Sequence, residues 1–142
     1  MPQPNVYGQY RQVQVSTASP GKLILMLYQG AIKALKKAIE MIDRKEYGEK
    51  GDQLIKAQDI IMELNLALDL KTGELAESLH QLYMYAYRKL VVANLEVDKD
   101  AIQEVVGMLE NLYEAWEVAV QEAEGTVPAN GPQAMPKFSV TG

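Results

Sequence analysis

The 142-residue chain has no cysteine and only one histidine. The lack of cysteine excludes disulfides and thiolate metal sites. One histidine and no cysteine also leave no nucleophilic triad. The glycines stand singly, so no glycine-rich phosphate loop occurs. We therefore expect neither an enzyme nor a cofactor.

Long apolar runs and clusters of basic residues are also missing. The longest apolar run, Leu23 to Tyr28, is far too short to cross a bilayer. The first residues have neither a basic start nor an apolar stretch, so no secretory signal is expected. The net charge of −5 argues against nucleic acid or an anionic membrane surface as a partner. We expect a cytoplasmic protein without membrane insertion.

Apolar residues recur at intervals of three and four over most of the chain, which predicts amphipathic helices. The expected helices span residues 20–44, 50–70, 74–96 and 99–124. Ser19 is the expected N-cap of the first helix, with Pro20 at its first position. Asp98 is the expected N-cap of the fourth. The expected breaks between the first and second helices include Gly48 and Gly51.

Four helices of similar length with short loops predict an all-α fold, an antiparallel up-down four-helix bundle. The expected organisation is a short N-terminal segment (1–18), the bundle (19–125) and a disordered tail (126–142). The spacing predicts one inward apolar stripe for each helix. These stripes are Ile24, Leu27, Ala31, Ala34, Ala38 and Ile42; Leu54, Ala57, Ile61, Leu64 and Leu68; Leu75, Leu79, Leu82, Ala86, Leu90, Ala93 and Val97; and Ile102, Val105, Leu109, Leu112 and Trp116.

Two further apolar stripes remain once these core positions are filled. One lies on the expected second helix and the other on the third, both off the core stripe on a wheel of 100° per residue. Their residues are Ile55, Met62 and Leu66, and Met84, Tyr87, Val91 and Leu95. Ordered stripes of this kind predict an exposed apolar surface that docks an amphipathic helix. A homo-oligomer interface on the same surface is the alternative.

The only motif that suggests a metal is Glu77-x-x-His80, the spacing used by di-iron carboxylate bundles. Such sites need the motif twice, together with two further glutamates that point inward. The wheel places Glu77 and His80 away from the core stripe. We therefore interpret the match as a coincidence of two exposed residues and expect no metal.

A series of short matches resembles the flagellin-specific export chaperones of the FliS family over about residues 7–120. The matching positions are Tyr10, the run Val15 to Ala31, Lys56-Ala57, Ile60-Ile61, Glu63-Leu64, Leu68-Asp69, Gly73 to Ala76, Leu82-Tyr83, Ala93-Asn94 and Trp116. The resemblance implies a four-helix bundle in the cytosol that binds the disordered C-terminal segment of flagellin. Such a chaperone stops flagellin from polymerising and presents it to the flagellar type III export gate.

The N-terminal segment holds Tyr7 and Tyr10, three residues apart, so both can lie on one side of a helical turn. We expect this segment to act as a lid, which folds over part of the exposed apolar surface formed by the two further stripes when flagellin is absent. A disordered leader is the alternative for the segment. For the whole protein, a generic helical adaptor or a self-associating bundle is the alternative to an export chaperone.

Overall fold

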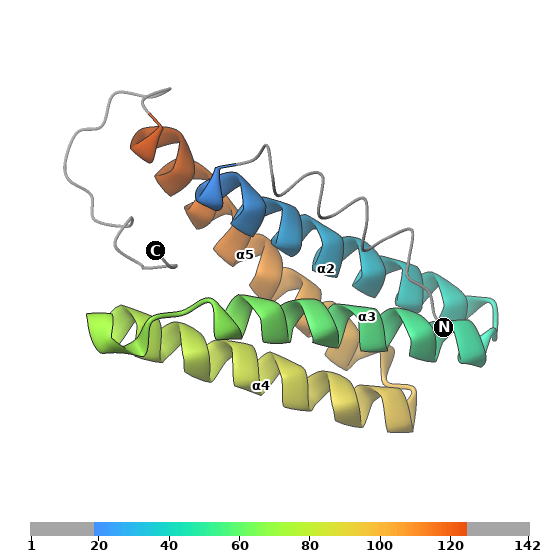
Figure 1. Cartoon of the computed structure of the whole chain (residues 1–142). Helices are drawn as coiled ribbons and strands as arrows, with labels where there is room; N and C mark the ends of the chain where they lie inside the picture. The colour runs from blue at the N-terminus through green and yellow to red at the C-terminus, as the bar shows by residue number, and fades with distance from the viewer. Residues whose placement is uncertain (1–18, 125–142) are drawn as a thin grey trace, which may run out of the picture.

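The computed structural model describes residues 19–124, which form four long helices and one short 3-10 helix (Figure 1). The long helices are α2 (Pro20–Asp43), α3 (Tyr47–Leu66), α4 (Glu74–Glu96) and α5 (Lys99–Ala123), and the 3-10 helix η1 spans Leu70–Thr72. Each long helix packs against the next, and α5 packs back against α2. Successive helices run in opposite directions, so the predicted all-α antiparallel bundle is confirmed (Figure 1). The expected N-terminal segment (1–18) and the expected tail (126–142) both lie outside the described residues.

The predicted helix starts of α2 and α5 are confirmed by their caps. The Ser19 hydroxyl accepts a hydrogen bond from the Lys22 backbone N–H at 3.2 Å, and Pro20 follows at the first helical position. The Asp98 carboxylate accepts from the Ala101 N–H at 3.1 Å. Each cap satisfies a backbone donor that has no partner within the first turn of its helix.

Helix α3 begins and ends earlier than the sequence predicted. It starts at Tyr47 and includes Gly48 and Gly51, which the pattern treated as breaks. A glycine costs only about 1 kcal/mol in a helix, and packing of α3 on both neighbours outweighs this. The other end stops at Leu66, and η1 then leads to Gly73, whose φ of 122° favours glycine.

The core stripe of α4 corrects three predicted residues. Leu75 and Leu82 were expected inside but are 48% and 38% exposed. The buried positions next to them are Ala76 and Tyr83. Small Ala76 lets the backbone of α4 approach the core, and Tyr83 is buried with a partner for its hydroxyl. The other predicted core residues of α4 are buried: Leu79, Ala86, Leu90 and Ala93.

Val97, the third corrected residue, lies after α4 and not on its inner face. Its φ of 53° and ψ of 50° are left-handed, and its side chain is 37% exposed. This conformation ends the helix, because the next N–H, that of Asp98, donates to the Ala93 carbonyl at 2.9 Å. A two-residue turn thus joins α4 to α5.

Two buried tyrosines meet across the centre of the bundle. The hydroxyls of Tyr28 on α2 and Tyr83 on α4 lie 2.6 Å apart, and the rings pack edge to face. The side chain of Trp116 on α5 hydrogen-bonds to the same pair. Trp116 is buried as predicted, whereas Leu112 is only partly buried. A buried hydroxyl without a partner costs about 1–3 kcal/mol, so the pair favours this arrangement of helices.

Burial raises the pKa of Tyr83 to about 12 and raises the pKa of Tyr28 far above its usual range. An unfolded chain ionises its tyrosines near pH 10. The folded state therefore binds more protons above that pH, and its stability must fall as pH rises. We expect the free energy of unfolding to drop by about 1.4 kcal/mol per pH unit for each tyrosine.

Urea unfolding between about pH 9 and 12 measures this dependence, with a Tyr28→Phe/Tyr83→Phe variant as the control. The control keeps both rings but lacks the two ionising groups, so its stability should fall less steeply above about pH 10. Equal slopes for both proteins would contradict the burial of the two hydroxyls.

Candidate functional site

Helices α3 and α4 are held side by side by two polar contacts, one near each end. The Lys50 ammonium donates to the backbone carbonyl of Asn94 at 3.0 Å and to its side-chain oxygen at 2.6 Å. At the other end, the His80 Nδ1 and Asn65 Oδ1 lie 2.7 Å apart. Lys50 is only 6% exposed, and its charge lies at the negative C-terminal end of α4. Both contacts fit one antiparallel register.

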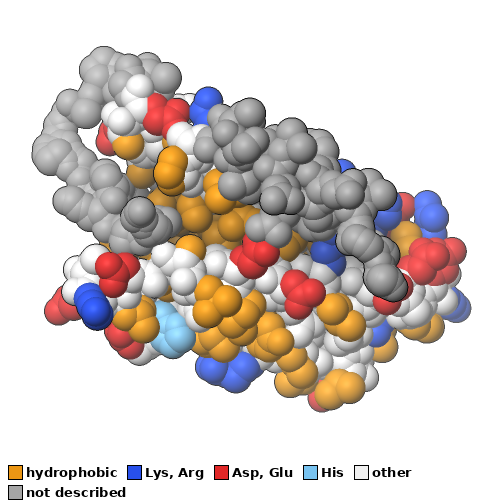
Figure 2. Space-filling view, viewed as in Figure 1, with side chains coloured by type: hydrophobic (Ala, Val, Ile, Leu, Met, Phe, Trp, Pro, Cys, Tyr) orange, Lys and Arg blue, Asp and Glu red, His pale blue; other side chains and the backbone are white. Residues whose placement is uncertain are grey.

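This register brings the two predicted apolar stripes together. It places Met62 level with Met84, and Ile55 level with Val91. The stripes lie on the outer flanks of α3 and α4 that border the same seam. We call this surface the apolar strip, which consists of Ile55, Met62, Leu66, Met84, Tyr87, Val91 and Leu95. Hydrophobic side chains gather over α3 and α4, with charged side chains around them (Figure 2).

The exposure of the strip varies along its length. Leu66 and Leu95 are 75% and 79% exposed, and Ile55 and Val91 are also exposed. The other three residues, Met62, Met84 and Tyr87, are partly buried, and Tyr87 packs against the core. The strip therefore has anchored residues in its middle and protruding leucines at opposite ends. The strip is therefore most exposed at its two ends.

The opposite flank of α4 also exposes apolar residues, among them Leu82, which was predicted to lie in the core, and Val92. There, however, polar contacts join α4 to α5. The Tyr85 hydroxyl donates to the Glu104 carboxylate at 2.6 Å, and the Lys89 ammonium lies 3.0 Å from the same carboxylate. These partners hold the pKa of Glu104 below its usual range. The apolar surface on this flank is thus interrupted by an ion pair, unlike the strip.

The described residues offer no group of three histidine or acidic side chains that could hold a metal ion. The single histidine of the chain, His80, contacts the side-chain amide of Asn65 across the α3–α4 seam. Within residues 19–124, no helix combines the length and the apolar content that a bilayer span needs. The proposed lid residues Tyr7 and Tyr10 lie outside the described residues.

Comparison with known proteins gives the family. The family described as "Flagellar protein FliS" matches residues 3–123. This chain belongs to the FliS family. It is 42% identical to the flagellar secretion chaperone FliS of Bacillus subtilis over 117 residues. These aligned residues make up 82% of this chain and 87% of the relative. It is 44% identical over 113 residues to the chaperone of the same name from Salmonella typhimurium, covering 75% of this chain and 84% of the relative.

A third relative, the flagellar secretion chaperone FliS of Escherichia coli, is 39% identical over 105 residues, or 72% of this chain and 76% of the relative. All three relatives are named as chaperones, a role that involves no catalysis. The family matches the resemblance found in the sequence, and the matched residues contain all four helices of the bundle.

Proposed function

We propose that this FliS-family protein is a cytosolic export chaperone that binds the disordered C-terminal segment of flagellin. It keeps that segment from polymerising and delivers it to the flagellar type III export gate. The observation that supports this proposal is the apolar strip along the α3–α4 seam. It lies on a protein whose relatives are named flagellar secretion chaperones.

The proposed mechanism is occupation of a surface. A segment that forms filaments through the apolar face of a helix cannot do so while that face lies on the strip. The two methionines at the middle of the strip suit this role, because a flexible thioether adapts to varied side chains. Binding needs no nucleotide in this mechanism, and the protein acts without a cofactor.

The energetics favour an extended contact. A segment that folds as it binds loses roughly 2–5 kcal/mol of the gross interaction energy to ordering. A standard interface buries about 1,600 Å², so a client that must also fold needs a larger one to bind tightly. The strip runs from Leu66 to Leu95, at opposite ends of the seam, and so provides length for an extended contact.

Aspartate in place of an exposed strip residue should weaken client binding without unfolding the bundle. We expect Leu66→Asp to raise the Kd for the flagellin segment by about tenfold or more, because a charge would be buried against the client. Its free energy of unfolding should change by less than about 0.5 kcal/mol, because Leu66 is 75% exposed. Titration calorimetry and urea unfolding measure the two effects.

Val118→Asp on α5 is the matched control, since Val118 is apolar and 56% exposed but does not belong to the strip. It should bind as the wild type does. Equal effects of Leu66→Asp and Val118→Asp would contradict the assignment of the strip. If light scattering instead shows a dimer that Leu66→Asp converts to a monomer, with no binding of flagellin, the protein is a self-associating bundle.

The lid is a further part of this proposal and concerns residues outside the described structure. Tyr7 and Tyr10 would cover part of the client surface until flagellin displaces them, which hides apolar surface from solvent. Hydrogen exchange tests this directly. Residues 6–14 should be partly protected in the free protein and should lose that protection when the flagellin segment is added. Random-coil exchange in both states would contradict the lid.

A further inference from the structure

Helices α4 and α5 lie close together at the turn that joins them and diverge toward the start of α4 (Figure 1). Ala93 and Leu75 show the effect, because they are five full turns apart and point in the same direction from α4. This direction faces α5, since Lys89, one turn before Ala93, contacts Glu104. Ala93 is 1% exposed, whereas Leu75 is 48% exposed. The α5-facing side of α4 is therefore covered near the turn and uncovered near the start of the helix.

The uncovered part of the α4–α5 seam is apolar on both helices. Leu82 lies on the same side of α4 as Leu75 and is 38% exposed. On α5, Ala115 lies on the side that bears Glu104 and is exposed, and Leu112 is only partly buried. Periodicity predicts all three of these leucines to be core residues, as they would be if the two helices stayed in contact. We call this surface the seam patch, which consists of Leu75, Leu82, Met108, Leu112 and Ala115.

The C-terminal residues of the chain start at the open end of this seam. Helix α5 runs antiparallel to α4 and ends at Ala123, so the residues after Glu124 start at the end of the bundle where α4 begins (Figure 1). Leu112 lies about 20 Å back along α5 from this point, at 1.5 Å per residue. Residues 126–138 can span up to about 43 Å at about 3.3 Å each. Phe138 can therefore reach every part of the seam patch.

The composition of residues 125–142 suits an apolar surface with an acidic border. They include Met135 and Phe138, which is the only phenylalanine of the chain. Their prolines favour an extended backbone, which lowers the entropy that docking costs. Lys137 is their only charged side chain. A carboxylate is available to it at Glu122, which lies on the same side of α5 as Ala115 and is partly exposed.

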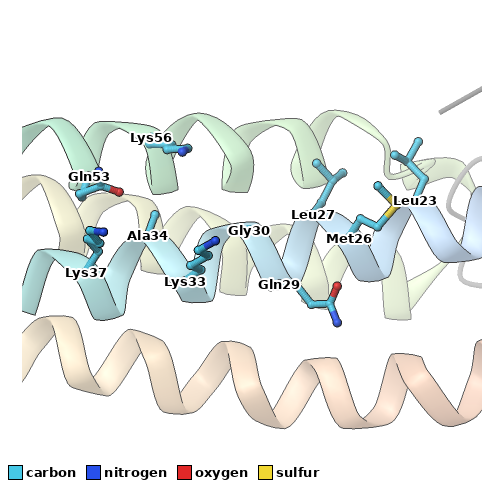
Figure 3. A pocket seen from close by; sticks show the side chains of 10 residues that line it. All are labelled: Leu23, Met26, Leu27, Gln29, Gly30, Lys33, Ala34, Lys37, Gln53 and Lys56. Carbon is cyan, nitrogen blue, oxygen red and sulfur yellow. The ribbon is translucent and has the colours of Figure 1, made fainter. Parts of the chain in front are cut away.

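The pocket between α2 and α3 suits these C-terminal residues less well. It has a volume of about 660 Å³, and Lys33, Lys37 and Lys56 are among the residues that line it (Figure 3). Like charges there oppose the docking of a segment whose only charged side chain is a lysine. The seam patch itself contains no charged residue. Charge therefore favours the seam patch over the pocket as the surface for residues 125–142.

We propose that the seam patch is a docking surface for the chain's own residues 125–142. Phe138 packs on the patch between α4 and α5, and Lys137 faces Glu122. The segment is tethered to α5, so its high effective concentration makes a small contact sufficient. Docking covers apolar surface that would otherwise favour association with other molecules. The inference goes beyond the proposed function, because this contact involves no client.

A spin label on the full-length protein tests the proposal, since the chain has no cysteine of its own. Ser139→Cys places a nitroxide next to Phe138, and the methionine methyl signals report which surface the label approaches. Each candidate surface has its own methionine: Met108 in the seam patch, Met62 in the apolar strip and Met26 in the α2–α3 pocket. We expect the Met108 signal to lose the most intensity, relative to the same protein with the label reduced.

The other outcomes of this experiment overturn the proposal. A greatest loss at Met62 or Met26 would place the segment on a different surface, and no loss at any methionine would show that it does not dock. A mixture of spin-labelled protein with isotope-labelled protein that carries no nitroxide tests a second copy as the occupant. Loss at Met108 in this mixture would show that the segment covers a neighbouring molecule.

Urea unfolding of full-length variants measures the same contact. We expect Phe138→Ala to lower the folding equilibrium constant by about fivefold, because a partly buried phenylalanine ring is lost. In a Leu75→Ala background the effect of Phe138→Ala should be smaller, because both changes remove one shared contact. A Leu95→Ala background is the matched control, since Leu95 is an exposed leucine of the apolar strip, and there the effect should be complete. Equal effects of Phe138→Ala in the two backgrounds would contradict docking on the seam patch.

Discussion

The hydrogen bond between Tyr28 and Tyr83 determines how the helices of this bundle face one another. The two residues come from helices that are not neighbours in the ring, so their contact passes through the core. A buried hydroxyl needs a partner, and each tyrosine provides one for the other. Once Tyr83 points inward, its neighbours Leu82 and Met84 must point about 100° to either side. One therefore faces the α5 side and the other the α3 side.

The position of the apolar strip follows from this orientation of α4 about its own axis. Met84 lies on the flank of α4 that borders α3, level with Met62. The polar contacts of Lys50 and His80 then fix the register along the seam without covering it. One buried apolar stripe on each helix is enough to fill the core. The additional apolar residues of α3 and α4 remain at the surface, where they are available to a partner.

Most of the architecture could be predicted because the helices have strong periodicity and clear caps. The predicted bounds of α4 match, and α2 differs by one residue at its end. The start of α3 could not be predicted from local sequence alone. Gly48 and Gly51 have low helix propensity, and it is packing against the neighbouring helices that keeps them helical. The core position of Tyr83 was missed for a related reason. Its partner is 55 residues away, and without it leucine is the better candidate for burial.

The candidate site could be predicted as two separate stripes but not as one surface. Wheel positions identify residues that leave the core, whereas the adjacency of Met62 and Met84 depends on the register of α3 against α4.

The claim that the strip binds the client is tested most directly by methyl NMR of the methionines. Met62 and Met84 lie in the strip, whereas Met41 is buried at 4% exposure and is not a strip residue. On addition of the flagellin C-terminal segment, we expect the methyl signals of Met62 and Met84 to shift and that of Met41 to stay in place. Unchanged signals from Met62 and Met84 in a saturated complex would contradict it.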